Sequence, residues 1–410
     1  MTPTKPGPEA PARLGPRPLA LHLAQAMASG LGALAALPAM RAGTMPWPAA
    51  AADEAAALAQ DLAQANPDAL FTATAAAQGR RLEEMLAGIR TYQSHPYRRD
   101  LPAPAVLWCE GTTKLLDYGG DGPPALFVPS LINRYYVLDL TAERSLLRWL
   151  AERGVRALVV DWDAPGVAER GFDLDAYIAG RLGRLLDAVL ERTGTRPVLV
   201  GYCLGGNLAL GLASLRQADL AALALLATPW NFHAGLGAQA QLLGLMEAGL
   251  EGLLQGFGEL PVDVLQALFA WLDPNLAARK FRRFQRLVPD SRAARLFVAL
   301  EDWLNDGVPL APQVARACLV DWYGRNRPMQ GGWQLGGRPV RPESLELPTL
   351  LAIPGRDRIV PPPSAAALQT VMAHAQVLTP TAGHIGMMVG GGAQTGLWQP
   401  LLAWLQSLAK

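Results

Sequence analysis

The sequence predicts an α/β fold built on a mostly parallel sheet. From about residue 104 onward, short apolar runs of strand length alternate with stretches of helical pattern. The runs show little polar alternation, which is typical of strands that helices cover on both faces. The helical stretches between them, such as residues 141–153 and 173–192, have the length of the crossover connections that parallel strands require.

Eight apolar runs are expected to form the sheet. They are residues 106–108, 115–118, 125–128, 157–160, 198–200, 223–226, 350–353 and 375–378. A long segment of helical pattern, residues 230–348, separates the sixth run from the seventh. We expect this insertion to lie over the active site as a cap, and a second helical layer at the sheet edge is the alternative. Its aromatic residues include Trp271, Phe281, Phe284, Trp303, Trp322 and Tyr323.

The chain before the sheet is predicted to be helical. Residues 1–18 are rich in proline and are expected to form a disordered tail. Residues 19–103 are expected to form an N-terminal helical region, with two or three helices broken near Pro67, and residues 104–410 the catalytic domain. Residues 19–40 are apolar enough to resemble a signal peptide or a membrane span. Their polar side chains favour an amphipathic or core-packed helix, and we expect a cytoplasmic protein.

Composition narrows the classes of function. Half of the 410 residues are hydrophobic, which supports a sizeable core, and the formal net charge is +1. That charge gives no indication of nucleic acid or of an anionic membrane as a partner. The three cysteines, Cys109, Cys203 and Cys318, are too few and too scattered for a disulfide framework or a metal cluster. We expect no bound metal and no cofactor.

One turn of the sequence has the pattern of a catalytic nucleophile. Gly201-Tyr202-Cys203-Leu204-Gly205-Gly206 lies between a predicted strand and a predicted helix. This is the nucleophile elbow of the α/β-hydrolase fold, with cysteine in place of serine. Glycine two places before and after the cysteine allows the strained turn. The alternative is that Cys203 is a small core residue on a tight turn.

The predicted elbow would activate the thiol of Cys203. The N-terminus of the following helix favours a thiolate, and the backbone N–H of Leu204 can donate to an oxyanion. A second donor is expected from residues 130–132. Cys109 and Cys318 lack such a setting, and we expect both to be buried and inert.

A cysteine nucleophile in this fold needs a base and an acid, in the chain order nucleophile, acid, histidine. His384 follows the last predicted strand, where a loop would bring it over the sheet edge, so we assign it as the base. Asp357 follows the penultimate strand and is assigned as the acid. His374 precedes the last strand and would point away, and His233 has no acid between it and Cys203. Asp161 is expected to be structural, binding loop N–H groups.

The motifs together resemble those of the polyhydroxyalkanoate synthases. The box at residues 201–206 is similar to the lipase-like box of that family, and residues 128–140, VPSLINRYYVLDL, to its Ile-Asn-x-Tyr-Tyr segment. Similar segments follow at residues 159–163, 228–232 and 326–337 and around Asp357 and His384. The resemblance covers residues 100–410. Two positions differ from the family pattern, Arg358 in place of histidine and Leu131 in place of tryptophan.

The resemblance implies an acyltransferase that polymerises (R)-3-hydroxyacyl-CoA through an acyl group on Cys203 and releases CoA. It implies a hydroxyacyl-CoA substrate, a polyester product, a possible homodimer or second synthase subunit, and possible association with polymer granules. Two alternatives remain. One is a Cys-Asp-His thioesterase or esterase, similar to dienelactone hydrolases or to a depolymerase. The other is a non-enzymatic granule or regulatory subunit, against which the complete triad argues.

Overall fold

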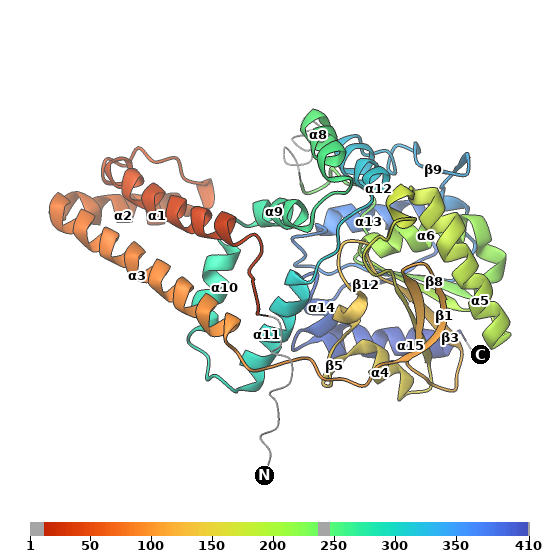
Figure 1. Ribbon diagram of the computed structural model, residues 1–410. Helices are drawn as coiled ribbons and strands as arrows, with labels where there is room; N and C mark the ends of the chain where they lie inside the picture. The colour runs from red at the N-terminus through yellow and green to blue at the C-terminus, as the bar shows by residue number, and fades with distance from the viewer. Residues whose placement is uncertain (1–11, 237–246, 409–410) are drawn as a thin grey trace, which may run out of the picture. The chain divides into compact units, whose positions relative to one another are not determined.

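The chain forms two compact units. The computed structural model describes residues 12–236 and 247–408. The first unit, called here the helical unit, comprises the chain up to residue 98 together with residues 266–305. The second, the sheet unit, comprises residues 99–265 and 306–410. Figure 1 shows the helices and strands of each unit.

The sheet unit is built on an eight-stranded sheet in the order β1-β2-β6-β3-β7-β8-β11-β12. β1 pairs with β2 and β2 with β6 in antiparallel fashion, whereas all other neighbours are parallel. The mostly parallel sheet predicted from the apolar runs is therefore confirmed. The strands are β1 (Ala105–Glu110), β2 (Thr113–Asp117), β3 (Pro124–Val128), β6 (Arg156–Asp161), β7 (Val198–Tyr202), β8 (Ala222–Leu226), β11 (Thr349–Ala352) and β12 (Gln376–Leu378).

Helices cover both faces of this sheet (Figure 1). α5 (Gly183–Thr193) and α6 (Leu204–Arg216) lie on one side, and α4 (Leu146–Ala151) and α15 (Gln399–Ser407) lie on the other. A π-helical segment, Ala176–Leu182, leads directly into α5, so the crossover predicted at residues 173–192 is confirmed. β3, β7 and β8 at the sheet centre are buried along their whole length.

The helix predicted at residues 141–153 is shorter than expected. Residues 139–145 form a small hairpin, β4 (Asp139–Thr141) and β5 (Arg144–Ser145), before α4 begins. The hydroxyl of Ser145 accepts a hydrogen bond from the backbone N–H of Arg148 at 3.1 Å. This N-cap fixes the start of α4, because it satisfies a backbone donor that has no partner inside the helix.

The remaining helical segments of the sheet unit lie before and after β11 and β12. Those before are α8 (Glu247–Phe257), α12 (Pro312–Arg316) and a π-helical segment, Ala317–Gly324. α13 (Pro362–Val371) lies between β11 and β12, and α14 (Gly386–Val389) and a π-helical turn, Gln394–Trp398, follow β12. α9 (Val262–Leu272) contains the point at which the chain passes from the sheet unit to the helical unit.

The helical unit contains α1 (Leu19–Arg41), α2 (Ala52–Gln64), α3 (Pro67–Gln93), α10 (Leu276–Phe284) and α11 (Arg292–Asn305). The break predicted near Pro67 is confirmed. Asn66 caps α3 by accepting from the N–H groups of Asp68 and Ala69, both at 3.0 Å, and Pro67 occupies the first helical position, where no N–H is needed.

The core of the helical unit joins α3 to the segment from α10 to α11. Its buried members are Met85, Ile89, Tyr92, Ala277, Phe281, Phe284, Ala294 and Val298. Phe281 and Phe284, predicted to belong to a cap over the active site, are thus core residues of the helical unit. Trp271 and Trp303 lie in the same part of the chain, residues 266–305. The predicted cap, residues 230–348, is therefore divided between the two units, and its residues 237–246 lie outside the described residues.

α1 is more exposed than the core-packed helix that its polar residues suggested. None of its 23 residues is buried, and Met27 and Leu31 are 57% and 66% exposed. Its length and apolar composition are sufficient to cross a membrane. One face of α1 nevertheless packs against the core of the helical unit, through the partly buried side chains of Leu19, Leu23 and Ala26.

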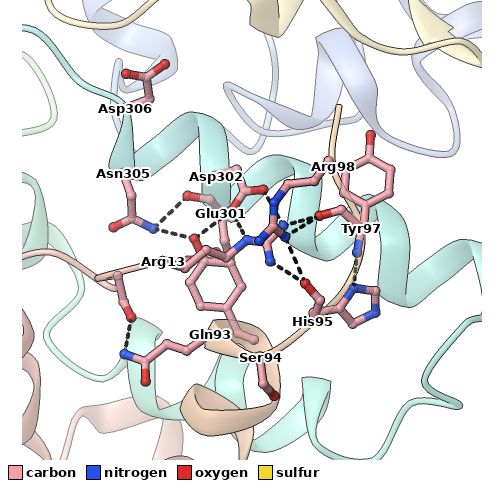
Figure 2. Close-up of polar contacts among 12 residues, drawn as sticks. Arg13, Gln93, Ser94, His95, Tyr97, Arg98, Glu301, Asp302, Asn305 and Asp306 are labelled. Atoms are coloured by element: carbon pink, nitrogen blue, oxygen red, sulfur yellow. Dashed lines mark hydrogen bonds and ion pairs between the residues drawn. The ribbon is translucent and has the colours of Figure 1, made fainter. Parts of the chain in front are cut away.

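Part of the predicted disordered tail is ordered and bound within the helical unit. Residues 12–18 are described, and residues 1–11 are not. The guanidinium of Arg13 forms an ion pair with Asp302, with contacts of 2.6 and 2.9 Å, and donates to the carbonyls of His95 and Tyr97 (Figure 2). The Arg13 side chain is only 6% exposed. A buried cation with so many partners holds this stretch of chain in place, which composition alone did not predict.

Candidate active site

Cys203 occupies a sharp turn between β7 and α6. Its backbone has φ 56° and ψ −129°, a conformation that a residue with a side chain rarely adopts. The backbone N–H of Cys203 donates to the carbonyl of Leu226 in β8 at 2.9 Å, so the turn is fixed to the neighbouring strand. The elbow predicted from the sequence is therefore present, with a half-buried thiol at the carboxyl edge of the sheet.

The glycines of this turn are required by close backbone contacts. A Cβ on Gly205 would lie 2.1 Å from the carbonyl oxygen of Val128, and one on Gly201 would lie 2.4 Å from Cα of Gly206. Neither position has room for a side chain, because the obstacle is backbone. The two glycines thus let α6 start directly against β3 and β7 and bring the cysteine to the end of the sheet.

The first predicted oxyanion donor lies at the start of α6. Leu204 is the first residue of that helix, so its N–H belongs to the group that has no partner within the helix. In the loop after β3, the hydroxyl of Ser130 accepts from the N–H of Ile132 at 3.1 Å. That N–H is therefore already used in a hydrogen bond within the loop. Among residues 130–132, the second donor is therefore expected from Ser130 or Leu131.

The predicted base and acid are in direct contact. Nδ1 of His384 lies 2.7 Å from Oδ2 of Asp357, and both residues are buried. Because an ionised carboxylate can only accept, Nδ1 carries the proton. The other carboxylate oxygen, Oδ1, accepts from the N–H groups of Ile359 and Val360 at 2.8 and 2.9 Å. The loop backbone thus fixes Oδ1 of Asp357, while Oδ2 of the same carboxylate orients the imidazole.

The imidazole of His384 is also hydrogen-bonded to Cys203. Since Nδ1 faces Asp357, the contact with the thiol falls to Nε2. Burial favours the neutral ring, but the negative charges of Cys203 and Asp357 and their hydrogen bonds outweigh it and raise the pKa of His384 to about 10. The imidazole thus lies where it can take the proton from Sγ of Cys203 and leave the thiolate, which is the nucleophilic form of a cysteine.

Tyr202, which the sequence reasoning did not single out, supports His384. Its ring stacks on the imidazole with centroids 5.0 Å apart, and its hydroxyl donates to the backbone carbonyl of His384 at 3.2 Å. Burial raises the pKa of Tyr202 well above its ordinary value, so the hydroxyl keeps its proton and remains a donor. The sequence indicated a role for Tyr202 only through its position between Gly201 and Cys203 in the elbow.

The other histidines lie where the chain order placed them. Nε2 of His374 lies 3.2 Å from the carbonyl of Leu347, just before β11 begins, and therefore at the opposite edge of the sheet from Cys203. His233 follows β8, and its Nε2 lies 3.0 Å from the carbonyl of Tyr323.

Asp161 also behaves as expected. Its Oδ1 accepts from the N–H of Asp163 at 3.2 Å, which confirms the predicted structural role of binding a loop N–H.

The two other cysteines differ from each other. Cys318 is buried, and burial raises its pKa to about 12, so it is an unreactive thiol as predicted. Cys109 is exposed, contrary to prediction. It lies on β1, the edge strand of the sheet, which pairs with β2 and contains exposed residues. An apolar run therefore identified the strand correctly but not its place at the edge.

Aromatic side chains from the two ends of the predicted insertion pack together in the sheet unit. Phe232 contacts Trp322 and Tyr323, with ring centroids 5.6 and 4.9 Å apart, and Trp322 contacts Trp333 at 5.0 Å. Burial and the charge of Cys203 raise the pKa of Tyr323. Of the four aromatic residues expected to shield the site, Trp322 and Tyr323 share a unit with Cys203, whereas Trp271 and Trp303 belong to the helical unit.

Metal ligands do not gather at this site. Within residues 12–236 and 247–408, no group of three or more histidine, cysteine or acidic side chains has the arrangement to hold a metal ion. The contacts instead join one thiol, one imidazole and one carboxylate in series, the arrangement used for nucleophilic catalysis of acyl transfer.

Comparison with known proteins agrees with this arrangement. Residues 123–391 match the family described as alpha/beta hydrolase fold. Relatives include three proteins named Poly(3-hydroxyalkanoate) polymerase subunit PhaC. The one from Haloferax mediterranei is 28% identical over 73% of this chain and 63% of its own length. Those from Haloarcula marismortui and Allochromatium vinosum are 27% and 29% identical, over 83% and 69% of this chain and 76% and 80% of their own lengths. The resemblance read from the motifs is confirmed.

The matched stretch is shorter than the Haloferax relative itself, since it spans less than two thirds of that protein. Three polymerase subunits from different organisms nevertheless align over most of this chain.

Proposed function

The chain belongs to the alpha/beta hydrolase family, and from that premise we propose that it is an acyltransferase that joins (R)-3-hydroxyacyl units from CoA thioesters into a polyester. The contact series from Cys203 through His384 to Asp357, on a strained elbow, carries this proposal. Similarity to poly(3-hydroxyalkanoate) polymerase subunits supports the choice of substrate.

In the first step, Sγ of Cys203 attacks the thioester carbonyl carbon. The developing oxyanion accepts from the N–H of Leu204 and from the loop after β3. The C–S bond to CoA then breaks, and the imidazolium of His384 supplies the proton that the leaving CoA sulfur takes up. One thioester replaces another, so the step is close to neutral in free energy and the acyl group on Cys203 remains activated.

In the second step, the hydroxyl of another hydroxyacyl unit attacks the acyl group on Cys203. His384, now neutral at Nε2, accepts the hydroxyl proton as the oxygen bonds to the carbonyl carbon. The C–S bond breaks and Cys203 is released as a thiolate beside the imidazolium. Asp357 keeps the ring oriented through both steps, and positioned proton transfer of this kind contributes roughly 10²–10⁴ in rate.

The proposal requires no metal and no cofactor other than the CoA thioester substrate. Its partners are the hydroxyacyl-CoA and the polyester, with a second synthase subunit or a second copy of the chain as the protein partner. We propose that the protein acts in the cytoplasm and at polymer granules, where a reducing environment keeps the Cys203 thiol free.

Incubation of the purified protein with 3-hydroxybutyryl-CoA tests the proposal. Free CoA thiol, insoluble polyester and free 3-hydroxybutyrate are measured together, and Cys203→Ala is the control. The proposal predicts CoA release with polyester and little free acid in the native chain and none of these products in the variant. CoA release that persists in Cys203→Ala would contradict it.

A thioesterase or esterase on the same scaffold is the second candidate. Two observations favour it. Of the four aromatic residues expected to shield the site, Trp322 and Tyr323 belong to the sheet unit and Trp271 and Trp303 do not. Arg358 and Leu131, next to catalytic loops, also depart from the synthase pattern. This function predicts free 3-hydroxybutyrate in step with CoA and no polyester.

A further inference from the structure

The two ends of the insertion after β8 are joined by a polar cluster, called here the clasp, which consists of Asn231, His233 and Asn326. Asn231 and His233 lie at the start of the insertion, directly after β8, and Asn326 lies where the chain leaves the π-helical segment Ala317–Gly324. All three belong to the sheet unit, as do Cys203 and His384.

Asn231 is the acceptor at the centre of the clasp. Its Oδ1 accepts from Nδ2 of Asn326 at 2.9 Å and from the backbone N–H groups of His233 and Ala234 at 3.1 and 3.2 Å. Oδ1 of Asn326 accepts in return from the N–H of Phe232 at 2.9 Å. The two amide side chains therefore connect the outgoing and returning stretches of chain in both directions.

His233 completes the clasp at the end of the π-helical segment. Its Nε2 lies 3.0 Å from the carbonyl of Tyr323 and 3.2 Å from that of Gly324. Because both partners are carbonyl oxygens, Nε2 is the donor. The last carbonyls of a helix have no partner within it, so His233 fixes the turn that carries Tyr323.

The conformation of Asn326 fits the same role. Its φ of +53° is in the left-handed region, which asparagine tolerates better than most residues, and its side chain is buried. The contact of the Phe232 ring with Trp322 and Tyr323 adds an apolar connection beside the polar one.

The stretch after β8 is bonded to the helix that follows the elbow, since Nδ2 of Asn207 donates to the carbonyl of Pro229 at 2.8 Å, and the ring of Phe232 in that stretch lies 4.9 Å from the ring of Tyr323. We infer that His233 is a positioning residue that holds Tyr323 on this side of the Cys203 elbow and so excludes water from the acyl group on that cysteine. The inference rests on the proposed acyltransferase function, in which the thioester must survive until a hydroxyl attacks. Loss of the Nε2 donor frees the turn of Tyr323 without touching Cys203, His384 or Asp357. Water then competes with the incoming hydroxyl for the acyl group.

The test compares His233→Leu, which removes the donor but keeps bulk, with His233→Gln, which restores an N–H at similar reach. His374→Leu is the matched control, because His374 also bonds a backbone carbonyl through Nε2, at the opposite edge of the sheet. Each protein is incubated with 3-hydroxybutyryl-CoA, and the ratio of free 3-hydroxybutyrate to released CoA is measured together with the thermal midpoint.

His233→Leu is expected to raise the ratio of free acid to CoA about fivefold, the effect of losing one hydrogen bond of ordinary net strength. Its initial rate of CoA release should stay within about twofold of the native chain, and His233→Gln and His374→Leu should give the native ratio. A structural role alone would lower the thermal midpoint and the total CoA released without moving the ratio.

An unchanged ratio in His233→Leu overturns the inference and leaves the proposed function intact. A native chain that already gives free acid in step with CoA, or that releases no CoA, contradicts the proposed function and removes the role assigned to His233 with it. The result with the native chain therefore distinguishes failure of this inference from failure of the proposed function.

Discussion

Replacing Asp357 by asparagine isolates the orienting role of its carboxylate. Asp357 accepts three hydrogen bonds, one from Nδ1 of His384 at 2.7 Å and two from the backbone N–H groups of Ile359 and Val360. An asparagine keeps an oxygen for the two backbone donors, so the loop should retain its shape. Its NH₂ group then faces Nδ1 and favours the tautomer with the proton on Nε2, which can no longer accept a proton.

The two effects of Asp357→Asn differ greatly in size. Stability loses one charge-assisted hydrogen bond, which contributes about 1.5–3 kcal/mol. Activity loses both the correct tautomer and the charge that stabilises the imidazolium, and a loss of about 10⁴ in rate is expected from the equivalent change in a serine triad. The assay is CoA release in the first turnover, with circular dichroism to show that the variant is folded. A folded Asp357→Asn whose rate lies within tenfold of the native rate would refute the assignment of Asp357 as the acid.

The pH dependence gives this prediction a second readout. The pKa of His384 is raised from 6.5 to about 10, so the imidazolium and its stabilising contacts are fully present below pH 6.5 and are lost as the pH rises through about 10. Activity that requires the ion pair should fall on the same alkaline limb. Asp357→Asn removes one of the negative charges that raise this pKa, so its alkaline limb should lie at lower pH. An alkaline limb that does not move would contradict the contribution of Asp357.

Three further predictions follow from other parts of the chain. His384→Ala should lower CoA release by at least 10², as expected for loss of a general base, whereas His374→Ala should retain most of it; equal losses would move the base elsewhere. Gly205→Ala should destabilise the fold by about 1–3 kcal/mol in thermal unfolding, because its Cβ would lie 2.1 Å from a backbone oxygen, and a variant of native stability would contradict that contact. Arg13→Leu should lower the stability of the helical unit by about 2–3 kcal/mol, since Asp302 loses its cation, and should leave CoA release unchanged; faster proteolysis within residues 12–98 would report the loss.

The sequence was informative where local pattern and chain order determine structure. Each central strand is an unbroken apolar run, and the positions of Cys203, Asp357 and His384 after successive strands placed all three at one edge of the sheet. The contacts among them agree with that order. Pro67 likewise marked the boundary before α3, and the capping of that helix by the adjacent Asn66 is equally local.

The sequence did not predict the features that depend on which distant segment a helix or loop packs against. Phe281 and Phe284 show that α10 buries one side, but nothing local shows that the other side of the contact is α3 in the helical unit. The ordered position of residues 12–18 depends on the ion pair between Arg13 and Asp302, which lie 289 residues apart in the sequence. The clasp was also missed, because Asn231 and Asn326 come together only after the insertion returns to the sheet.

The most direct test of the account is to find the acyl group itself. The protein is incubated briefly with 3-hydroxybutyryl-CoA, quenched in acid and digested, and the peptides that carry Cys109, Cys203 and Cys318 are measured by mass. The account predicts a hydroxybutyryl adduct, or a short oligomer of it, on the peptide with Cys203 and on neither of the others. An adduct on a different residue, or CoA release with Cys203 unmodified at every quench time, would contradict it.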